Sequence, residues 1–213
     1  MTEAPGFSAI LTSSFDPIHA LSPETISELL GHYELLVRWN RTLNLTSIAG
    51  LEETVLRHYC ESLFVGIHLP PRQVSVLDVG SGAGFPGIPM AILRPDCRFT
   101  LAESHQRKAV FLREATRHLS NVRVAAGRAE DVEGTFDWVV SRAVKWPDVL
   151  KIARPGVELS GAARPGHTIA LLLGQEDAAE VVLQPRFSWR PTIPLPWGHR
   201  RVLVVGQTAQ PCG

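Results

Sequence analysis

The sequence of 213 residues has few cysteines, only Cys60, Cys97 and Cys212. Their number is odd, and neither a CxxC pair nor a histidine cluster accompanies them. A disulfide framework and a zinc site are therefore not expected, and we predict a chain that binds no metal. A chain with so few cysteines suits a reducing compartment such as the cytoplasm.

Long apolar runs are also lacking, and none approaches the roughly 20 residues that a membrane-spanning helix needs. A secretory signal has a basic stretch before an apolar core, and the first 20 residues show no such pattern. Charge is balanced, since 21 Lys and Arg face 21 Asp and Glu. This balance argues against a protein that coats nucleic acid nonspecifically. We expect a cytoplasmic monomer with no membrane partner.

The charges are unevenly distributed along the chain. Between Arg98 and Arg128 the sequence has seven Lys or Arg and two acids. Between Ala129 and Glu180 it has nine acids and five bases. This pattern predicts a mildly basic face, but on charge alone an ordinary solvated helix surface explains it equally well.

Apolar spacing divides the chain into two parts. Residues 1–70 show helical periodicity, with Ser22 as the N-cap and Pro23 at the first helical position of one long helix. From residue 71 strand-like and helical runs alternate, which predicts a parallel sheet with helices on both faces. The last two strand-like runs, 186–195 and 200–207, are separated by four residues and should pair antiparallel. The fold class is therefore α/β, with an N-terminal helical extension (1–70) and a Rossmann-like core (71–213).

The most informative stretch is LDVGSGAGFPGIP at residues 77–89, where a strand runs into glycines at every second position. Such a turn brings the backbone close to a ligand, and the following helix adds partial positive charge. A dinucleotide fingerprint needs glycines at offsets 0, 2 and 5. Here Gly80, Gly82 and Gly84 are followed by Phe85 at offset 5. A purely structural turn remains the alternative when the stretch is considered alone.

An acid, Glu103, ends the next predicted strand, where its carboxylate could accept hydrogen bonds from both ribose hydroxyls of a nucleoside. Ala129 and Glu130 follow the third strand, where a loop would flank the adenine. Asp78 would tolerate an amino group near the turn and repel a pyrophosphate. A nucleoside held without a pyrophosphate indicates S-adenosylmethionine. Taken alone, Glu103 could also be a surface acid at a strand end.

Several motifs resemble one known family. They are NLTSI (44–48), RHYCESL (57–63), LDVGSGAGFPGIPMAILRP (77–95), LAES (101–104), RKAVFL (107–112) and FDWVVSRA (136–143). These motifs resemble the RsmG or GidB family, class I methyltransferases that modify a guanine N7 in bacterial 16S ribosomal RNA. The resemblance implies S-adenosylmethionine as cofactor and 16S rRNA or the small ribosomal subunit as partner. It also implies a set of cofactor-binding residues: Gly80, Gly82, Phe85, Glu103, Ser104, Ala129, Glu130 and Arg142.

The chain departs from the family pattern at three places. The family has a Lys where Leu173 precedes Gly174, another Lys near the end of the last strand where Gln207 stands, and an Asp-Ser pair where this chain has Glu61-Ser62. These departures concern the surface that would face RNA rather than the cofactor turn.

Guanine N7 carries a free lone pair, so its methylation requires orientation rather than proton removal. In agreement, SRAV (141–144) stands where amino-group methyltransferases have an Asn/Asp-Pro-Pro-aromatic motif, and the loops after the fourth and fifth strands lack the cysteine that cytosine-C5 enzymes use. Arg142, an exposed Arg at the end of the fourth strand, is the candidate catalytic residue. It could bind the methionine carboxylate, orient guanine through O6, or pair with Glu103 or Glu130.

Other assignments remain open from the sequence. His58 could contact RNA or make an interhelical hydrogen bond, and Trp39 could stack on a base or pack in the core. A methyltransferase for a small metabolite is the alternative function. A cofactor sensor or RNA-binding module without activity is a third.

Overall fold

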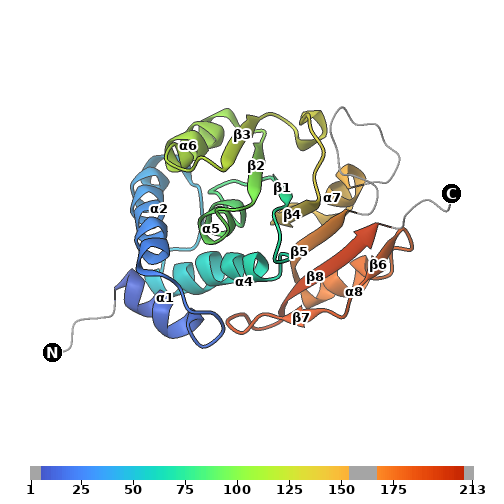
Figure 1. Cartoon of the computed structure of the whole chain (residues 1–213), viewed down its shortest axis with the longest axis horizontal. Coiled ribbons are helices and arrows are strands. Elements are labelled where there is room, and N and C mark those ends of the chain that lie inside the picture. The colour runs from blue at the N-terminus through green and yellow to red at the C-terminus, as the bar shows by residue number, and fades with distance from the viewer. Residues whose placement is uncertain (1–5, 154–166, 209–213) are drawn as a thin grey trace.

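A computed structural model describes residues 6–153 and 167–208. Within these residues one sheet of eight strands has the order β3-β2-β1-β4-β5-β8-β6, with β7 paired to β8. Strands β1 to β5 run parallel, and β8 runs antiparallel to its neighbours β5 and β6 (Figure 1). The predicted α/β fold, mainly parallel with antiparallel strands at its end, is confirmed. Cys212 and the last residues of a helix predicted at 146–156 lie outside the described ranges.

The strands range from two residues in β7 to eight in β8. Their bounds are β1 (Ser75–Val79), β2 (Arg98–Glu103), β3 (Val122–Ala126), β4 (Trp138–Arg142), β5 (Thr168–Gly174), β6 (Phe187–Trp189), β7 (Ile193–Pro194) and β8 (Arg201–Thr208).

Helices precede the sheet and connect its strands. Before β1 come α1 (Phe7–Phe15), α2 (Pro23–Leu43), α3 (Leu51–Thr54), the π-helical turn η1 (Val55–Cys60) and α4 (Glu61–Ile67). The connections contain α5 (Gly87–Leu93), α6 (Gln106–Thr116), the 3-10 turn η2 (Ala129–Asp131), α7 (Trp146–Ile152) and α8 (Gln175–Val181). Helix α8 and the π-helical turn are not predicted by the apolar spacing. None of the helices in residues 6–153 and 167–208 has the length and apolar character needed to cross a membrane.

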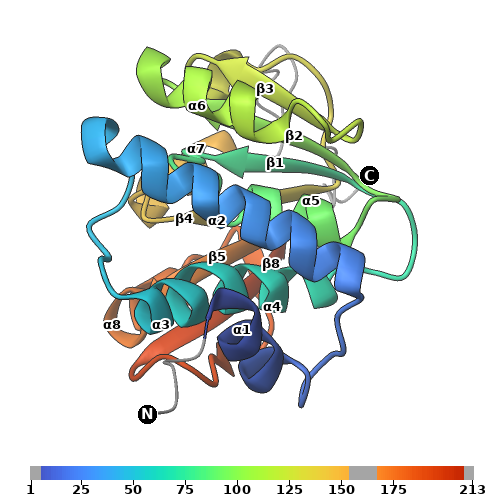
Figure 2. The same ribbon diagram turned by 90° about the vertical axis from the view of Figure 1, so that its left-hand side faces the viewer.

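Helix α2 begins and ends where its sequence directs. The Ser22 hydroxyl accepts a hydrogen bond from the Thr25 N–H at 3.2 Å, and Pro23 occupies the first helical position. At the other end Asn44 takes a left-handed conformation with φ of 47°, a common helix stop. The chain therefore turns sharply into residues 44–48, which lie next to the carboxyl edge of the sheet (Figure 2).

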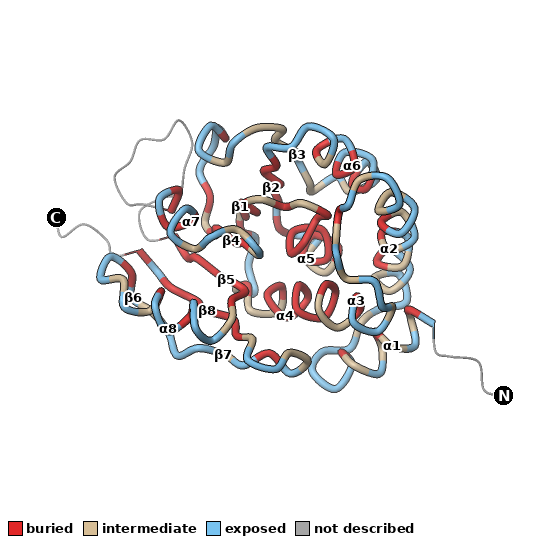
Figure 3. Tube along the Cα trace, turned by 180° about the vertical axis from the view of Figure 1, so that it is seen from behind, coloured by how far each residue is buried: buried red, intermediate tan, exposed pale blue. Residues whose placement is uncertain are grey.

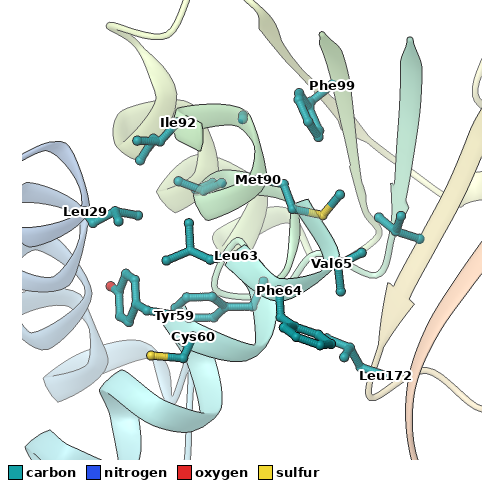
Figure 4. Close-up of a cluster of buried hydrophobic side chains, with 14 of the residues drawn as sticks. Leu29, Tyr59, Cys60, Leu63, Phe64, Val65, Met90, Ile92, Phe99 and Leu172 are labelled. Carbon is teal, nitrogen blue, oxygen red and sulfur yellow. The ribbon is translucent and has the colours of Figure 1, made fainter. Parts of the chain in front are cut away.

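Two apolar layers sandwich the sheet because successive strand residues point to opposite faces. In β4, Trp138 and Val140 face the layer formed with α1, α2, α4, α5 and α6, whereas Val139 faces α7 and α8. The first layer joins Tyr59, Leu63 and Phe64 of the N-terminal helices to Phe99 and Leu172 of the strands (Figure 4). Burial is consequently densest in the central strands and in α4 and α5 (Figure 3).

Candidate active site

A pocket of about 720 Å³ lies at the carboxyl edge of the sheet, where β1 and β4 meet. The strand order reverses there, and open α/β sheets bind their ligands at such a switch point. Chain segments far apart in the sequence form its wall: the loop after α2, the first turns of α3 and η1, the glycine turn, and the ends of β2 and β4. The lining residues are Asn44, Leu45, Thr46, Ser47, Ile48, Glu53, Arg57, His58, Gly80, Ser81, Gly82, Ala83, Phe85, Glu103, Lys108, Arg142, Ala143 and Val144.

The glycine turn forms the floor of this pocket. Gly82 and Gly84 have φ of 56° and 90°, a region that side chains with a Cβ rarely adopt. At Gly84 a Cβ would also lie 2.3 Å from Ile88 Cδ1, whereas at Gly82 the nearest atom would be 3.8 Å away. Gly84 therefore packs the turn against α5, and Gly82 leaves the backbone open to a ligand.

Asp78 lies beneath the turn and does not line the pocket. Its Oδ2 accepts a hydrogen bond from the Gly87 N–H at 3.0 Å, which joins β1 to the start of α5. Burial raises the pKa of Asp78 to about 7, and the nearby charge of Glu103 acts in the same direction. This position does not support the expectation that Asp78 meets an amino group in the site. Asp78 instead contacts the start of α5.

Glu103 is placed as the sequence predicts. Its Oε2 accepts from the Gly82 N–H at 2.9 Å, and its Oε1 accepts from the His105 N–H at 2.7 Å. These bonds fix a buried carboxylate beside the turn, and each oxygen retains a further lone pair. The structure does not bring Ser104, Ala129 or Glu130 into the pocket lining. Ser104 is exposed after β2, and the other two lie in η2 after β3.

Arg142 lies in a cluster of three arginines around one carboxylate. Its Nη1 donates to the Arg57 carbonyl at 2.6 Å. Arg201 donates twice to the fully buried Glu61, with both nitrogen–oxygen distances 2.9 Å. Burial lowers the pKa of Arg142 to about 10. The negative charge of Glu61 raises this pKa, whereas the positive charges of Arg201 and Arg57 lower it further. Arg142 is thus largely buried rather than exposed as expected, and its partner is a backbone carbonyl rather than Glu103 or Glu130.

His58 and Thr46 connect the loop after α2 to the turn. The His58 ring stacks on Phe85 with centroids 4.4 Å apart and planes 7° apart, and its Nε2 lies 2.7 Å from the Thr46 hydroxyl. Asn40 holds the loop by bonds of 2.9 and 3.0 Å to the Thr46 backbone. Burial, and then the charges of Arg142 and Arg57, lower the pKa of His58 to about 3, so the ring is neutral. Trp39 instead packs edge-on against Phe111.

A family model described as "rRNA small subunit methyltransferase G" (GidB) matches residues 25–186. The chain belongs to this family. The family prediction from the motifs is therefore confirmed, and so is the prediction of a methyltransferase.

Curated relatives named ribosomal RNA small subunit methyltransferase G support this membership. The one from Xanthomonas campestris pv. campestris strain B100 is 38% identical over 191 residues, which cover 87% of this chain and 85% of the relative. The one from Dichelobacter nodosus is 45% identical over 128 residues, 58% of this chain and 60% of the relative.

Solved methyltransferase structures share the fold of this chain. A SAM dependent methyltransferase from Aquifex aeolicus has a TM-score of 0.57 at 14% identity, covering 74% of this chain and 93% of that one. A ribosomal protein L11 methylase from Lactobacillus delbrueckii subsp. bulgaricus has a TM-score of 0.55 at 12% identity, covering 75% and 80%. These likenesses confirm the class I methyltransferase fold.

The methyl donor of the GidB family is S-adenosylmethionine, and the pocket fits its chemistry. Gly82 offers backbone open to a ligand, and Glu103 presents a fixed carboxylate that suits two ribose hydroxyls. Arg57 also lines the pocket, and its Nε is buried without a hydrogen-bond partner in the described part of the chain. Gly80, Phe85 and Arg142 complete the predicted cofactor residues that line the pocket.

His32 supports the site from α2, and no sequence signal pointed to it. Its Nδ1 lies 2.9 Å from the Tyr59 hydroxyl, and its Nε2 lies 3.1 Å from the Ala83 carbonyl in the glycine turn. One buried ring thus ties α2 and η1 to the glycine turn. Burial lowers the pKa of His32 to about 4.

The protein should lose stability as pH falls from about 6.5 to 4. His32 and His58 have folded pKa values of about 4 and 3, below the ordinary 6.5, so the unfolded chain binds protons that the folded chain excludes. Each histidine therefore lowers the free energy of unfolding by about 1.4 kcal/mol for every unit by which the pH falls in this range. Asp78, with its pKa raised from 3.8 to about 7, opposes them because the folded chain binds its proton more readily. Two histidines outweigh one aspartate, which leaves a net loss of roughly 1.4 kcal/mol per unit.

Urea denaturation of the wild type at pH 7, 6 and 5 measures this loss. Asp78→Asn removes the opposing contribution and should make the loss between pH 6 and 5 steeper. A free energy of unfolding that rises over that interval would contradict the assignment of two neutral buried histidines.

Proposed function

We propose that this chain transfers a methyl group from S-adenosylmethionine to guanine N7 at a specific position of 16S ribosomal RNA. The main support for this proposal is a single pocket, which is lined by the glycine turn, Glu103, the loop at 44–48, Arg57 and His58. All of these residues lie within the match to the GidB family, whose name specifies small-subunit rRNA. The names of the relatives favour this substrate over a small metabolite.

In this proposal Gly80, Gly82, Phe85 and Glu103 hold the cofactor, and Arg142 orients its carboxylate or the guanine O6. Ser104, Ala129 and Glu130 lie on loops at the same sheet edge and would flank the adenine. The bound cofactor supplies a methyl group on a positively charged sulfur. The chain itself acts by binding and orienting the two partners and by excluding water from between them.

Proton removal is not needed at guanine N7, and the pocket agrees with this. His58 is neutral but, with a pKa of about 3, is a very weak base at neutral pH. Among the described residues that line the pocket there is no cysteine, the nucleophile that methylation of cytosine C5 requires. The site is therefore suited to a nucleophile that already presents a lone pair.

The division of the chain belongs to the same proposal. The N-terminal extension (1–70) supplies the pocket residues from Asn44 to His58, and the core (71–213) supplies the cofactor turn. We propose that the extension forms the RNA-facing side of the site, and that the protein works as a cytoplasmic monomer.

A labelled-methyl assay tests the function. Purified protein with tritiated S-adenosylmethionine is offered naked 16S rRNA, small ribosomal subunits, or an RNA-free metabolite extract, and the product is cleaved chemically at N7-methylguanine. Label in one of the two RNA samples, with cleavage at one position, is the expected result. Label only in the metabolite extract, or at a position other than N7, contradicts the proposal.

The basic stretch at 98–128 does not form a single face. Arg98 begins β2 at the amino edge of the sheet, opposite the pocket. Arg107 and Lys108 lie in the first turn of α6, and Lys108 lines the pocket. Arg38 and Arg41 are exposed near the end of α2, which lies beside α6 (Figure 2). The ends of two neighbouring helices thus form a basic rim of Arg38, Arg41, Arg107 and Lys108, of which Lys108 lines the pocket.

Binding of RNA should be modest in strength and sensitive to salt. If this rim neutralises about three to five phosphates, log K should fall against log salt with a slope of roughly −3 to −5 on duplex RNA. Filter binding between 50 and 300 mM salt (about sixfold) measures the slope. Arg41→Ala should make it shallower by about one, whereas Arg98→Ala at the far edge should leave it unchanged. A flat response in the wild type speaks for a small uncharged substrate.

A further inference from the structure

The outer half of the pocket is lined by two adjacent groups of opposite charge, Glu53 and Arg57. They are four residues apart, and Glu53 Oε1 lies 3.3 Å from Arg57 Nη1. Their side chains are 54% and 38% exposed, so neither charge is consumed in a buried pair. Exposed pairs at this spacing contribute little to stability, which leaves both groups available to a ligand.

Glu53 is the carboxylate in this pocket that no backbone group holds. The described acids of the lining are Glu53 and Glu103, and Glu103 is engaged by the N–H groups of Gly82 and His105. Arg57 in turn has a buried Nε with no hydrogen-bond partner in the described ranges. Glu53 Oε1 accepts from Arg57 Nη1, so Oε2 and the second lone pair of Oε1 are available to a ligand beside the guanidinium of Arg57.

These two groups are linked to Arg142, which ends β4 and lines the same pocket. Arg142 binds the Arg57 carbonyl, and the Arg57 side chain contacts Glu53. The edge of a guanine presents groups in a matching order: the N7 and O6 acceptors, then the N1–H and N2–H₂ donors. Adenine in the same orientation would present a donor to the arginine and an acceptor to the carboxylate, which leaves both unsatisfied.

We propose that Arg57 donates to O6 of the target guanine while Glu53 accepts from its N1–H and N2–H₂ groups. The pair thereby selects guanine over adenine and holds the base with N7 toward the cofactor. The π-helical turn η1 supports this role, because such turns are rare and concentrate at functional sites. The proposal rests on the proposed function and adds the groups that distinguish the base.

The test replaces the target guanosine by inosine, which keeps O6, N1–H and N7 but lacks the N2 amino group. Single-turnover methylation is measured on small-subunit RNA that carries either base at the position mapped in the labelled-methyl assay. The wild type should methylate guanosine at least about tenfold faster, the loss expected for one hydrogen bond to a charged group. In Glu53→Gln, whose amide opposes the N2 amino group, the ratio should fall to about one.

Matched variants separate base recognition from structure. Glu52→Gln changes the neighbouring exposed acid, which does not line the pocket, and should keep the wild-type ratio. Arg57→Met should slow both bases alike, because both carry O6. Glu53→Asp should give an intermediate ratio, and circular dichroism checks that each variant is folded.

Two results overturn the inference while leaving the proposed function intact. One is a wild-type ratio near one, and the other is a Glu53→Gln ratio equal to that of the wild type, whether or not its absolute rates fall. Failure of the wild type to methylate guanosine N7 at all is a separate result, and it rejects the proposed function itself.

Discussion

Glu103→Ala is expected to weaken the binding of S-adenosylmethionine by about 30- to 1000-fold, roughly 2–4 kcal/mol. The carboxylate would accept hydrogen bonds from both ribose hydroxyls, and the alanine variant loses both. It also removes the acceptor of the Gly82 and His105 N–H groups, which hold the turn and the start of α6 in place. The loss therefore combines missing contacts with a less ordered turn.

Calorimetry on the purified protein measures this affinity, with S-adenosylhomocysteine as a second ligand. Glu114→Ala is the matched control, because Glu114 is an acid of α6 whose partner is the surface residue Arg117. Thermal unfolding of each variant shows how far the turn itself is destabilised. Unchanged affinity in Glu103→Ala would show that this carboxylate does not bind the ribose. Competition by NAD would contradict the argument that Phe85, in place of the third glycine of a dinucleotide fingerprint, excludes a dinucleotide.

Local sequence is sufficient to predict where the glycine turn, Glu103 and Arg142 lie in the fold. The turn, Glu103 at the end of β2 and Arg142 at the end of β4 follow from strand–helix alternation, because parallel strands end at one edge of the sheet. Ser104, Ala129 and Glu130 were implied by the family resemblance, yet they lie outside the pocket lining. Their loops follow the correct strands, but the strand order alone does not specify how far each loop reaches toward the pocket.

The other half of the site depends on contacts between distant residues, which spacing along the chain does not encode. His32 contacts Ala83 across 51 residues, and Arg142 contacts Arg57 across 85. Glu61, expected on the surface that would face RNA, is instead fully buried and pairs with Arg201 of β8, 140 residues later. The basic stretch 98–128 is likewise continuous in sequence but not in space. It begins with β2 at the amino edge of the sheet and reaches the carboxyl edge at the start of α6.

Arg142→Ala is expected to lower kcat/KM for rRNA methylation by about 100-fold or more, equivalent to roughly 2.7 kcal/mol of lost transition-state stabilisation. Arg142 ends β4 beside the glycine turn, and its donors suit the cofactor carboxylate or guanine O6. Its burial strengthens either contact, because a charge in a partly desolvated site interacts more strongly with a bound ligand. Neither role requires proton transfer, so the defect should be similar from pH 6.5 to 8.5.

The burial of Arg142 also changes what is expected for stability. An exposed arginine at a strand end would contribute little to folding, but Arg142 is largely buried and donates to the Arg57 carbonyl. Its removal leaves that carbonyl without this donor, at a cost of about 1–3 kcal/mol in the free energy of unfolding. Its removal also ends the attraction to Glu61 and the weaker repulsion from Arg201 and Arg57, so the charges of the cluster do not offset this cost.

Single-turnover methylation of small-subunit RNA, with protein varied from below to above saturation, gives kcat/KM and the maximal rate. Assaying the variant below its unfolding temperature separates this defect from the loss of stability. Arg142→Lys should recover only part of the rate, since a point charge replaces a planar fork with several donors. Arg200→Ala is the matched control, as Arg200 is 71% exposed and pairs with Glu176 at the surface. It should keep the wild-type rate. A wild-type rate in Arg142→Ala would reject the orienting role of this side chain, and full recovery in Arg142→Lys would show that charge alone, rather than paired donors, holds the ligand.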